Sequence, residues 1–158
     1  RGLPGSERLF VIGLLADIGH LVMYQTVPEL AATARESAER DGKALDVSER
    51  EVVGCDFSEI GAALADLWQL PPSFAGAIGT QLCPRLGGEY GNEAALLSLA
   101  RCVVEAERRN QSSADAAASL EADIWPLLEL EPEQLADIRE EAELHLAAYV
   151  NLFFSSAH

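Results

Sequence analysis

The stretch Gly13–His20, with the sequence GLLADIGH, decides how this chain is interpreted. Apolar residues continue on both sides of it, from Leu9 to Met23, at the three- and four-residue spacing of one helix face. This spacing predicts a single helix from Ser6 through Met23, with Ser6 as its N-cap. Asp17 falls inside the apolar run, where an unpaired carboxylate is costly, so we expect it to have a specific partner.

Helical spacing recurs along the rest of the chain, with helix-stopping residues between the segments. We expect no strand, because apolar and polar residues do not alternate over any useful length. The segment 83–91 contains a proline and three glycines and is expected to be a loop. The sequence therefore predicts an all-α fold, a compact bundle of about eight helices. The expected later helices cover residues 29–40, 47–53, 56–68, 73–81, 92–109, 114–128 and 132–153.

Composition and charge exclude several classes of function. Of the 158 residues, 49% are apolar and 23% are charged, as in a soluble globular protein. The chain has 26 acidic residues against 11 basic ones, of which Lys43 is the one lysine, and its formal net charge is -15. Such a charge disfavours binding to nucleic acid and to anionic membranes.

The apolar stretch Leu9–Tyr24 is interrupted by Asp17 and His20, so we expect it not to span a membrane. No signal peptide is recognisable, and we expect a cytoplasmic protein.

The remaining conspicuous residues have simple structural interpretations. Asp56 and Glu59 have the spacing of a capping box, which predicts the start of a helix. His20 lies three residues after Asp17, on the same helix face, and we interpret it as an interior or rim histidine. The two tryptophans are expected to anchor the core, and the three cysteines to be reduced and mostly buried, because no CxxC pair is present. These residues are Trp68, Trp125, Cys55, Cys83 and Cys102.

Three stretches, in the right order and at the right separation, resemble the HDOD family, whose members are non-catalytic relatives of the HD metal-dependent phosphohydrolases. A typical member has Gly-Leu-Leu-His-Asp-Ile-Gly where this chain has GLLADIG at 13–19. The second signature, Gly-x-Asp-His-x-x-x-Gly before a tryptophan and Leu-Pro, stands here as GCDFSEIG at 54–61 and WQLP at 68–71. The third, Ala-Ile followed by a His-His pair, stands as AIGTQL at 77–82. The resemblance covers roughly residues 8–84.

The resemblance also implies that a metal site has lost its ligands. In the catalytic HD enzymes, histidines and an adjacent aspartate at these positions hold metal ions, which activate water and bind phosphoryl oxygens. Alanine, phenylalanine and leucine have no lone pair to donate, and the remaining aspartate alone cannot hold a metal usefully. We therefore expect no catalytic residue, no metal and no cofactor. The degenerate positions are Ala16, Asp17, Phe57, Gln81 and Leu82, with His20, Asp56 and Glu59 as further candidates near the pocket.

The function implied by the resemblance is regulatory. We expect one HDOD-like domain of HD-superfamily type over residues 1–158, holding the C-terminal portion of the family domain, with the upstream part absent from this chain. Such a domain would act without turnover in a bacterial signalling pathway, through protein partners, and a homo-oligomer is left open.

Two alternatives remain open at this point. The first is an HD-type phosphohydrolase with a metal site rebuilt around Asp17, His20 and Asp56. The second is a sensor of a small ligand such as a nucleotide, using the emptied pocket lined by Ala16, Phe57 and Leu82. In that second case, Phe57 could equally fill the pocket itself.

Overall fold

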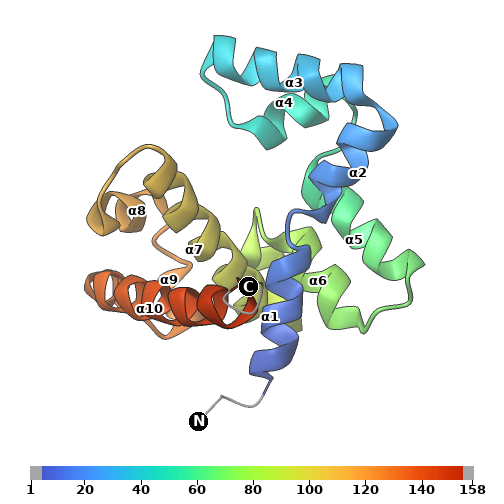
Figure 1. Ribbon diagram of the computed structural model, residues 1–158. Coiled ribbons are helices and arrows are strands. Elements are labelled where there is room, and N and C mark those ends of the chain that lie inside the picture. Colours follow the sequence, from blue (N-terminus) through green and yellow to red (C-terminus); the bar gives the residue numbers. More distant parts are fainter. Residues whose placement is uncertain (1–4, 155–158) are drawn as a thin grey trace. The chain divides into compact units, whose positions relative to one another are not determined.

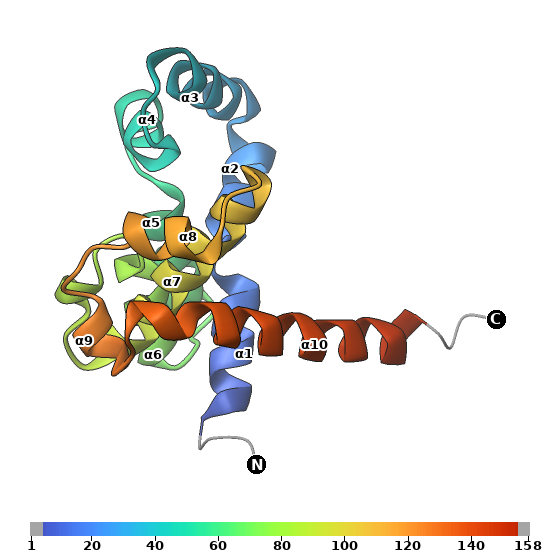
Figure 2. The same ribbon diagram turned by 90° about the vertical axis from the view of Figure 1, so that its left-hand side faces the viewer.

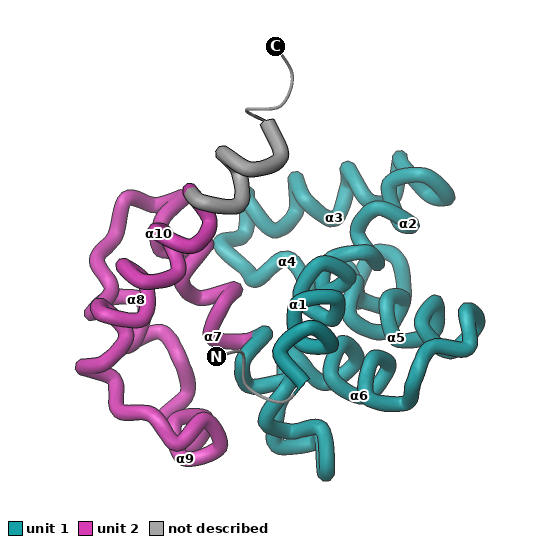
Figure 3. Tube along the Cα trace, turned by 60° about the horizontal axis from the view of Figure 1, so that its bottom comes forward, with its two compact units in different colours: residues 1–97 teal, residues 98–158 magenta. Residues whose placement is uncertain are grey.

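We describe residues 5–154 of the computed structural model, and side chains as far as residue 147 (Figure 1). Every regular element among the described residues is a helix, which confirms the predicted all-α fold. The chain divides into two compact units, residues 1–97 and 98–158 (Figure 3). Helix α7, Gly91–Arg108, contributes to both units. That the two units make up one domain stays a prediction.

The first unit holds the three motif stretches. Helix α5 packs against both α2 and α6, whereas α3 lies along α4 (Figures 1 and 2). The segment expected to be a loop forms the 3-10 helix η1, which is kinked at Gly88. The elements that precede α7 are α1 Ser6–Leu15, α2 Ile18–Thr26, α3 Pro28–Asp41, α4 Leu45–Val52, α5 Phe57–Leu67, α6 Pro72–Thr80 and η1 Pro84–Tyr90.

The prediction of one helix from Ser6 through Met23 is wrong. Helix α1 ends at Leu15 and α2 begins at Ile18, so Ala16 and Asp17 form a turn between them. The two helices need different directions, because α1 packs against α6 whereas α2 packs against α5. The side chain of Asp17 is 72% exposed, so the expectation of a carboxylate inside an apolar helix is wrong as well. The N-cap of α1 is Gly5 and not Ser6.

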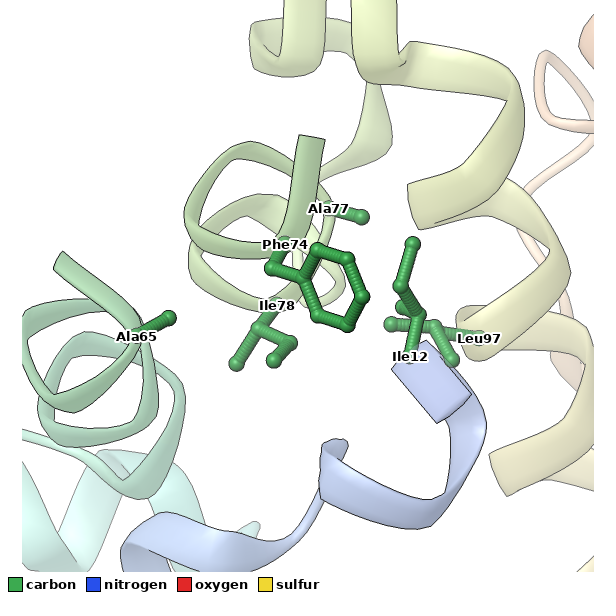
Figure 4. Packing of buried hydrophobic residues seen from close by; sticks show 6 residues of the cluster. All are labelled: Ile12, Ala65, Phe74, Ala77, Ile78 and Leu97. Atoms are coloured by element: carbon green, nitrogen blue, oxygen red, sulfur yellow. The ribbon is translucent and has the colours of Figure 1, made fainter. Parts of the chain in front are cut away.

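The core of the first unit is small and apolar. Its residues come from α1, α5, α6 and the first part of α7, and their side chains converge in Figure 4. Burying a side chain of the size of leucine or phenylalanine stabilises a fold by about 1.5–3 kcal/mol. Trp68 does not belong to this core, contrary to expectation, because it follows the last turn of α5 and is 51% exposed. The cluster consists of Ile12, Ala65, Phe74, Ala77, Ile78 and Leu97.

Gly19 allows α2 to approach α5 closely. A Cβ atom at this position would lie 1.9 Å from the carbonyl oxygen of Phe57, a distance that no pair of non-bonded heavy atoms tolerates. Any side chain at residue 19 would therefore push the two helices apart. This close approach brings the turn at Asp17 and the start of α5 to the same end of the unit.

The second unit contains the rest of α7, three short helical elements and one long helix. The short elements are α8 Ser113–Ser119, α9 Trp125–Leu128 and η2 Pro132–Gln134, and the long helix is α10 Leu135–Phe154. Helix α10 is one long helix, which contacts α8 (Figure 2). The predicted helix over 114–128 is divided in two, because the backbone becomes extended at Leu120. Trp125 is 7% exposed, which confirms the expected core position of this tryptophan.

Residues 6–26 also have the length and composition of a membrane-spanning helix, and they are the one such stretch in the described part of the chain. The sequence-based exclusion of a span was therefore too strong. Core helices of soluble proteins and signal sequences have the same length and composition, and 17% of the most apolar window is buried here. Here the stretch forms two helices, and both are packed against other helices of the first unit.

Candidate functional site

Asp56 is completely buried at the N-terminus of α5, and both of its carboxylate oxygens accept hydrogen bonds. Its Oδ1 accepts from the backbone N–H of Ser58 at 2.8 Å, from the Ser58 hydroxyl at 2.7 Å and from the N–H of Glu59 at 3.0 Å. Its Oδ2 accepts from Nε of Arg50 at 2.6 Å. The Glu59 carboxylate accepts from the N–H of Asp56 at 3.0 Å, which completes the predicted capping box.

The surroundings of Asp56 keep it ionised. Burial alone would raise the pKa of its carboxyl group, but the hydrogen bonds from Ser58, Glu59 and Arg50 outweigh burial and lower this pKa. The hydrogen bond between Arg50 and Asp56 also raises the pKa of the Arg50 guanidinium. An ionised carboxylate with both oxygens engaged is a helix cap, and it has no free lone pair directed at a substrate or a metal.

Glu49, on α4, is a second buried acid that sequence reasoning missed. It is 2% exposed, and its Oε2 accepts a hydrogen bond from the backbone N–H of Phe57 at 3.1 Å. Its Oε1 lies 3.1 Å from Nε2 of His20, although this buried nitrogen lacks the alignment of a hydrogen bond. Glu49 therefore connects α4 to the starts of both α2 and α5. In the sequence it stands in the charged run DVSEREV, where nothing distinguishes it from its exposed neighbours.

The His20 ring is stacked with two other aromatic rings, those of Phe57 and Tyr24, and these rings are here called the aromatic stack. It is parallel to Phe57 within 12° at a centroid distance of 4.1 Å, and to Tyr24 within 14° at 6.1 Å. The guanidinium carbon of Arg35 lies 5.3 Å from the centre of the Tyr24 ring, and this arginine donates a hydrogen bond to the Tyr24 hydroxyl. The aromatic stack thus links Phe57, at one emptied motif position, to Arg35 on α3.

Gln81 is also completely buried and joins the third motif stretch to the first. Its Nε2 donates to the carbonyl oxygen of Ala16 at 2.9 Å and to that of Ile78 at 3.0 Å. Its Oε1 is buried and has no hydrogen-bond partner in the part of the chain that the structure describes. The neighbouring Leu82 is half-buried. The amide of Gln81 therefore ties the end of α6 to the turn between α1 and α2.

The structure brings some of the predicted site residues together and separates others. Ala16 and Gln81 are in contact, and Phe57 packs on His20. Asp17 points to solvent, with its Oδ1 3.8 Å from Nδ1 of His20, whereas Asp56 is engaged as a helix cap. Within residues 5–147, no three His, Cys, Asp or Glu side chains are placed to share a metal ion. The residues at the motif positions therefore do not fit the metal that the HD enzymes hold.

Two of the three cysteines lie next to site residues in the sequence, and the surroundings of Cys55 disfavour its reactive form. All three are free and half-buried, so they are less buried than expected. Cys55 and Cys83 each adjoin a site residue in the sequence, and the pKa of Cys55 is raised, first by burial and then by the carboxylates of Glu59, Asp56 and Glu49. A raised pKa keeps this thiol protonated, and a protonated thiol is a poor nucleophile.

Comparison with known proteins agrees with this architecture. Residues 1–83 match the HDOD domain. Because the match lies in the N-terminal half of the chain, the expectation that the chain holds the C-terminal portion of that domain is not confirmed. The crystal structure of a "putative phosphohydrolase" from Shewanella amazonensis SB2B is similar, with a TM-score of 0.69 and 29% sequence identity. The similarity covers 89% of this chain and 51% of that one, so this chain spans about half of its length. No curated protein matches.

Proposed function

This chain belongs to the HDOD family, and on that basis we propose that it is a non-enzymatic regulatory domain. It would act in a bacterial signalling pathway, in the cytoplasm, by binding a protein partner. The proposal rests on how the residues at the former metal-ligand positions are packed and hydrogen-bonded. Phe57 is 2% exposed and stacked on His20, and Gln81 is hydrogen-bonded to the Ala16 carbonyl. Where the HD enzymes have metal-binding side chains, this chain has an aromatic ring stacked on His20 and an amide hydrogen-bonded to backbone carbonyls.

The chemistry of an HD hydrolase needs several imidazole and carboxylate ligands that converge on one point. Ala16, Phe57 and Leu82 have no lone pair to donate. The amide nitrogen of Gln81 donates to two carbonyl oxygens, and its Oε1 supplies a single oxygen, which alone is too few ligands to hold a metal. Asp17 is the motif aspartate that does not cap its helix, and its side chain is directed to solvent. These features favour a role in binding over a role in catalysis.

An exposed apolar face supports binding to a protein partner. Phe10 and Leu14 lie four residues apart on α1, so they share a face, and they are 64% and 67% exposed. Leu21 on α2 is 52% exposed. Exposed large apolar side chains that share one helix face, as Phe10 and Leu14 do, are typical of interaction sites.

Metal analysis combined with activity assays tests the absence of catalysis. We expect the purified protein to contain no stoichiometric manganese, iron or nickel, and to hydrolyse none of a panel of phosphodiesters and nucleotides. The Asp17→Asn variant is the matched control, because activity that is equal in both proteins does not come from a site built on Asp17. Stoichiometric metal together with turnover that depends on Asp17 would overturn the proposal.

A pair of substitutions tests the binding role. We expect the Phe10→Ser, Leu14→Ser double variant to lose the partner that the wild-type protein retains from cell extract. Leu86→Ser is the matched control, because Leu86 is 76% exposed on η1 and lies outside the α1 face. If the control variant loses the partner equally, the α1 face is not the binding surface.

The second candidate function is an HD-type phosphohydrolase with a rebuilt site, and the similarity to the Shewanella protein favours it. This candidate requires Asp17 and His20 to act without Asp56, which is engaged by Arg50 and the α5 N-terminus. It predicts that Asp17→Asn abolishes turnover and leaves the melting temperature unchanged.

A nucleotide sensor at the emptied pocket would instead require Phe57 to move. Thermal-shift assays with cyclic dinucleotides and nucleotides test for such a sensor. No shift with any of these ligands favours a pocket filled by Phe57.

A further inference from the structure

Helices α3 and α4 are a pair that packs mainly on itself (Figures 1 and 2). Residues 28–52, which make up the two helices and the turn between them, are here called the α3–α4 arm. Each helix of the arm contacts the other more extensively than it contacts any further element of the described chain. The apolar cluster of the first unit contains no residue of the arm. The internal packing of the arm is therefore separate from the core of its unit.

The two connections between the arm and the rest of the unit have the backbone of hinges. Val27, between α2 and α3, is non-helical, with a φ angle of -137° and a ψ angle of 56°. Beside this connection Arg35 of α3 donates to the exposed Tyr24 hydroxyl of α2. Gly54, after α4, has a φ angle of 96°, which favours glycine, and a Cβ atom there would meet no atom within 4 Å. The glycine thus serves the backbone path and not a close contact, as is usual where elements turn relative to one another.

Two neighbouring residues of α4, here called the polar latch, hold the arm against the starts of α2 and α5. Glu49 is 2% exposed, its Oε2 accepts from the N–H of Phe57 at 3.1 Å, and its Oε1 lies 3.1 Å from Nε2 of His20. Arg50 donates from Nε to Oδ2 of the buried Asp56 at 2.6 Å. The contact between α4 and these elements is therefore made by polar groups that water can also satisfy.

We propose that the α3–α4 arm opens as a unit about these two hinges, with Glu49 and Arg50 as the latch that closes it over His20 and Phe57. Opening returns the buried Glu49 carboxylate to water, and this hydration offsets much of the cost of breaking its contacts. Segments with few apolar contacts to their surroundings open at a lower free energy than the whole molecule unfolds. This inference does not depend on the proposed regulatory function.

Amide hydrogen exchange of the full chain, followed by NMR, tests the proposal. The Phe57 N–H reports opening, because its acceptor is Glu49 on the arm. The Ser58 N–H is a reference one residue away, because its acceptor is Asp56 at the start of the same helix. The Ile78 N–H, in the core of α6, reports unfolding of the unit. We expect the Phe57 amide to be protected at least about tenfold less than the amides of Ser58 and Ile78.

Arg50→Gln tests whether the two contacts of the latch open together. The substitution weakens the contact with Asp56 and leaves the acceptor of the Phe57 amide in place. If the arm opens as a unit, the protection of the Phe57 amide should fall about tenfold further, because a charge-assisted hydrogen bond is lost. The protection of the Ser58 and Ile78 amides should stay unchanged, which separates opening of the arm from fraying of α5 and from a general loss of stability.

Lys43→Gln is the matched control, because the ion pair between Lys43 and Glu51 lies entirely within the arm. This variant should protect the Phe57 amide as the wild-type protein does. The proposal is overturned if the three amides are equally protected in the wild-type protein. It is also overturned if Arg50→Gln leaves the protection of the Phe57 amide unchanged or lowers that of all three amides equally.

Discussion

Asp17 and Asp56 occupy equivalent places, since each is the residue immediately before the first turn of a helix. The backbone of Asp56 is extended, with a ψ angle of 172°, and its carboxylate accepts from the N–H groups of the first turn of α5. The ψ angle of Asp17 is 10°, because α1 ends only two residues earlier, and its carboxylate caps nothing. The residue type and the position before the helix are the same in the two places. The path by which the backbone enters the helix decides which aspartate becomes structural.

The largest effect that tests this comparison is expected for Asp56→Ala. The substitution removes the cap of α5 and leaves Arg50 without its carboxylate, so the free energy of unfolding should fall by about 2–4 kcal/mol. Urea denaturation followed by circular dichroism measures this change. A loss below about 1 kcal/mol would mean that water replaces the side chain at the helix start, and the contrast with Asp17 would then disappear.

Glu49→Ala should produce the next largest effect. It removes the acceptor of the buried Phe57 N–H, which we expect to lower the free energy of unfolding by about 1–3 kcal/mol. Glu49→Gln keeps an oxygen that can accept from Phe57 but removes the charge beside His20. The difference between the two variants in the same urea assay therefore separates the hydrogen bond from the charge. Equal losses would show that the charge near His20 matters and that the Phe57 contact does not.

The stability of the protein should depend on pH through Asp56. Its pKa is lower in the folded state than the ordinary value of 3.8, so its ionised form stabilises the fold. This contribution is complete above pH 3.8 and is lost as the pH falls through the lowered pKa of the folded state. Unfolding measured between pH 6 and pH 2.5 should therefore show a smaller acid loss in Asp56→Asn than in the wild-type protein. Parallel curves for the two proteins would assign the acid sensitivity to other groups.

The smallest effect is expected for Asp17→Ala. Its carboxylate is 72% exposed and forms no cap, so the free energy of unfolding should change by less than about 0.5 kcal/mol. The same urea assay that is used for Asp56→Ala gives this value, which makes the two variants a matched pair. A loss comparable to that of Asp56→Ala would show that the 3.8 Å approach to His20 is a strong contact.

Local features of the sequence were good guides to the fold. Apolar spacing located most helices, and the Asp56–Glu59 capping box was predictable because both partners lie within one turn. The break at Ala16 was not predictable, because neither a glycine nor a proline marks it and its cause is the different packing of α1 and α2. The exposure of Trp68 was missed for a similar reason, since spacing along one helix does not show whether another helix covers that face.

The candidate site was predictable in part. The motif positions indicated which residues would lie near one another, and Gln81 does contact Ala16 although 65 residues separate them. The roles of Glu49, Tyr24 and Arg35 were not predictable, because they depend on contacts between helices that are distant from the motifs. A buried glutamate such as Glu49 has the same appearance in a sequence as its exposed neighbours.

Lys43 gives the chain a single side-chain amine, placed in the turn between α3 and α4. Its ammonium lies 2.8 Å from Glu51, and the hydrogen bond to that carboxylate raises the pKa of Lys43. Amine-directed dyes and cross-linkers therefore modify one lysine, and they react faster at alkaline pH. A lysine-mediated cross-link to a partner would place that partner near the α3–α4 corner. A partner beyond the reach of Lys43 would instead need carboxyl-directed or photoactivated chemistry.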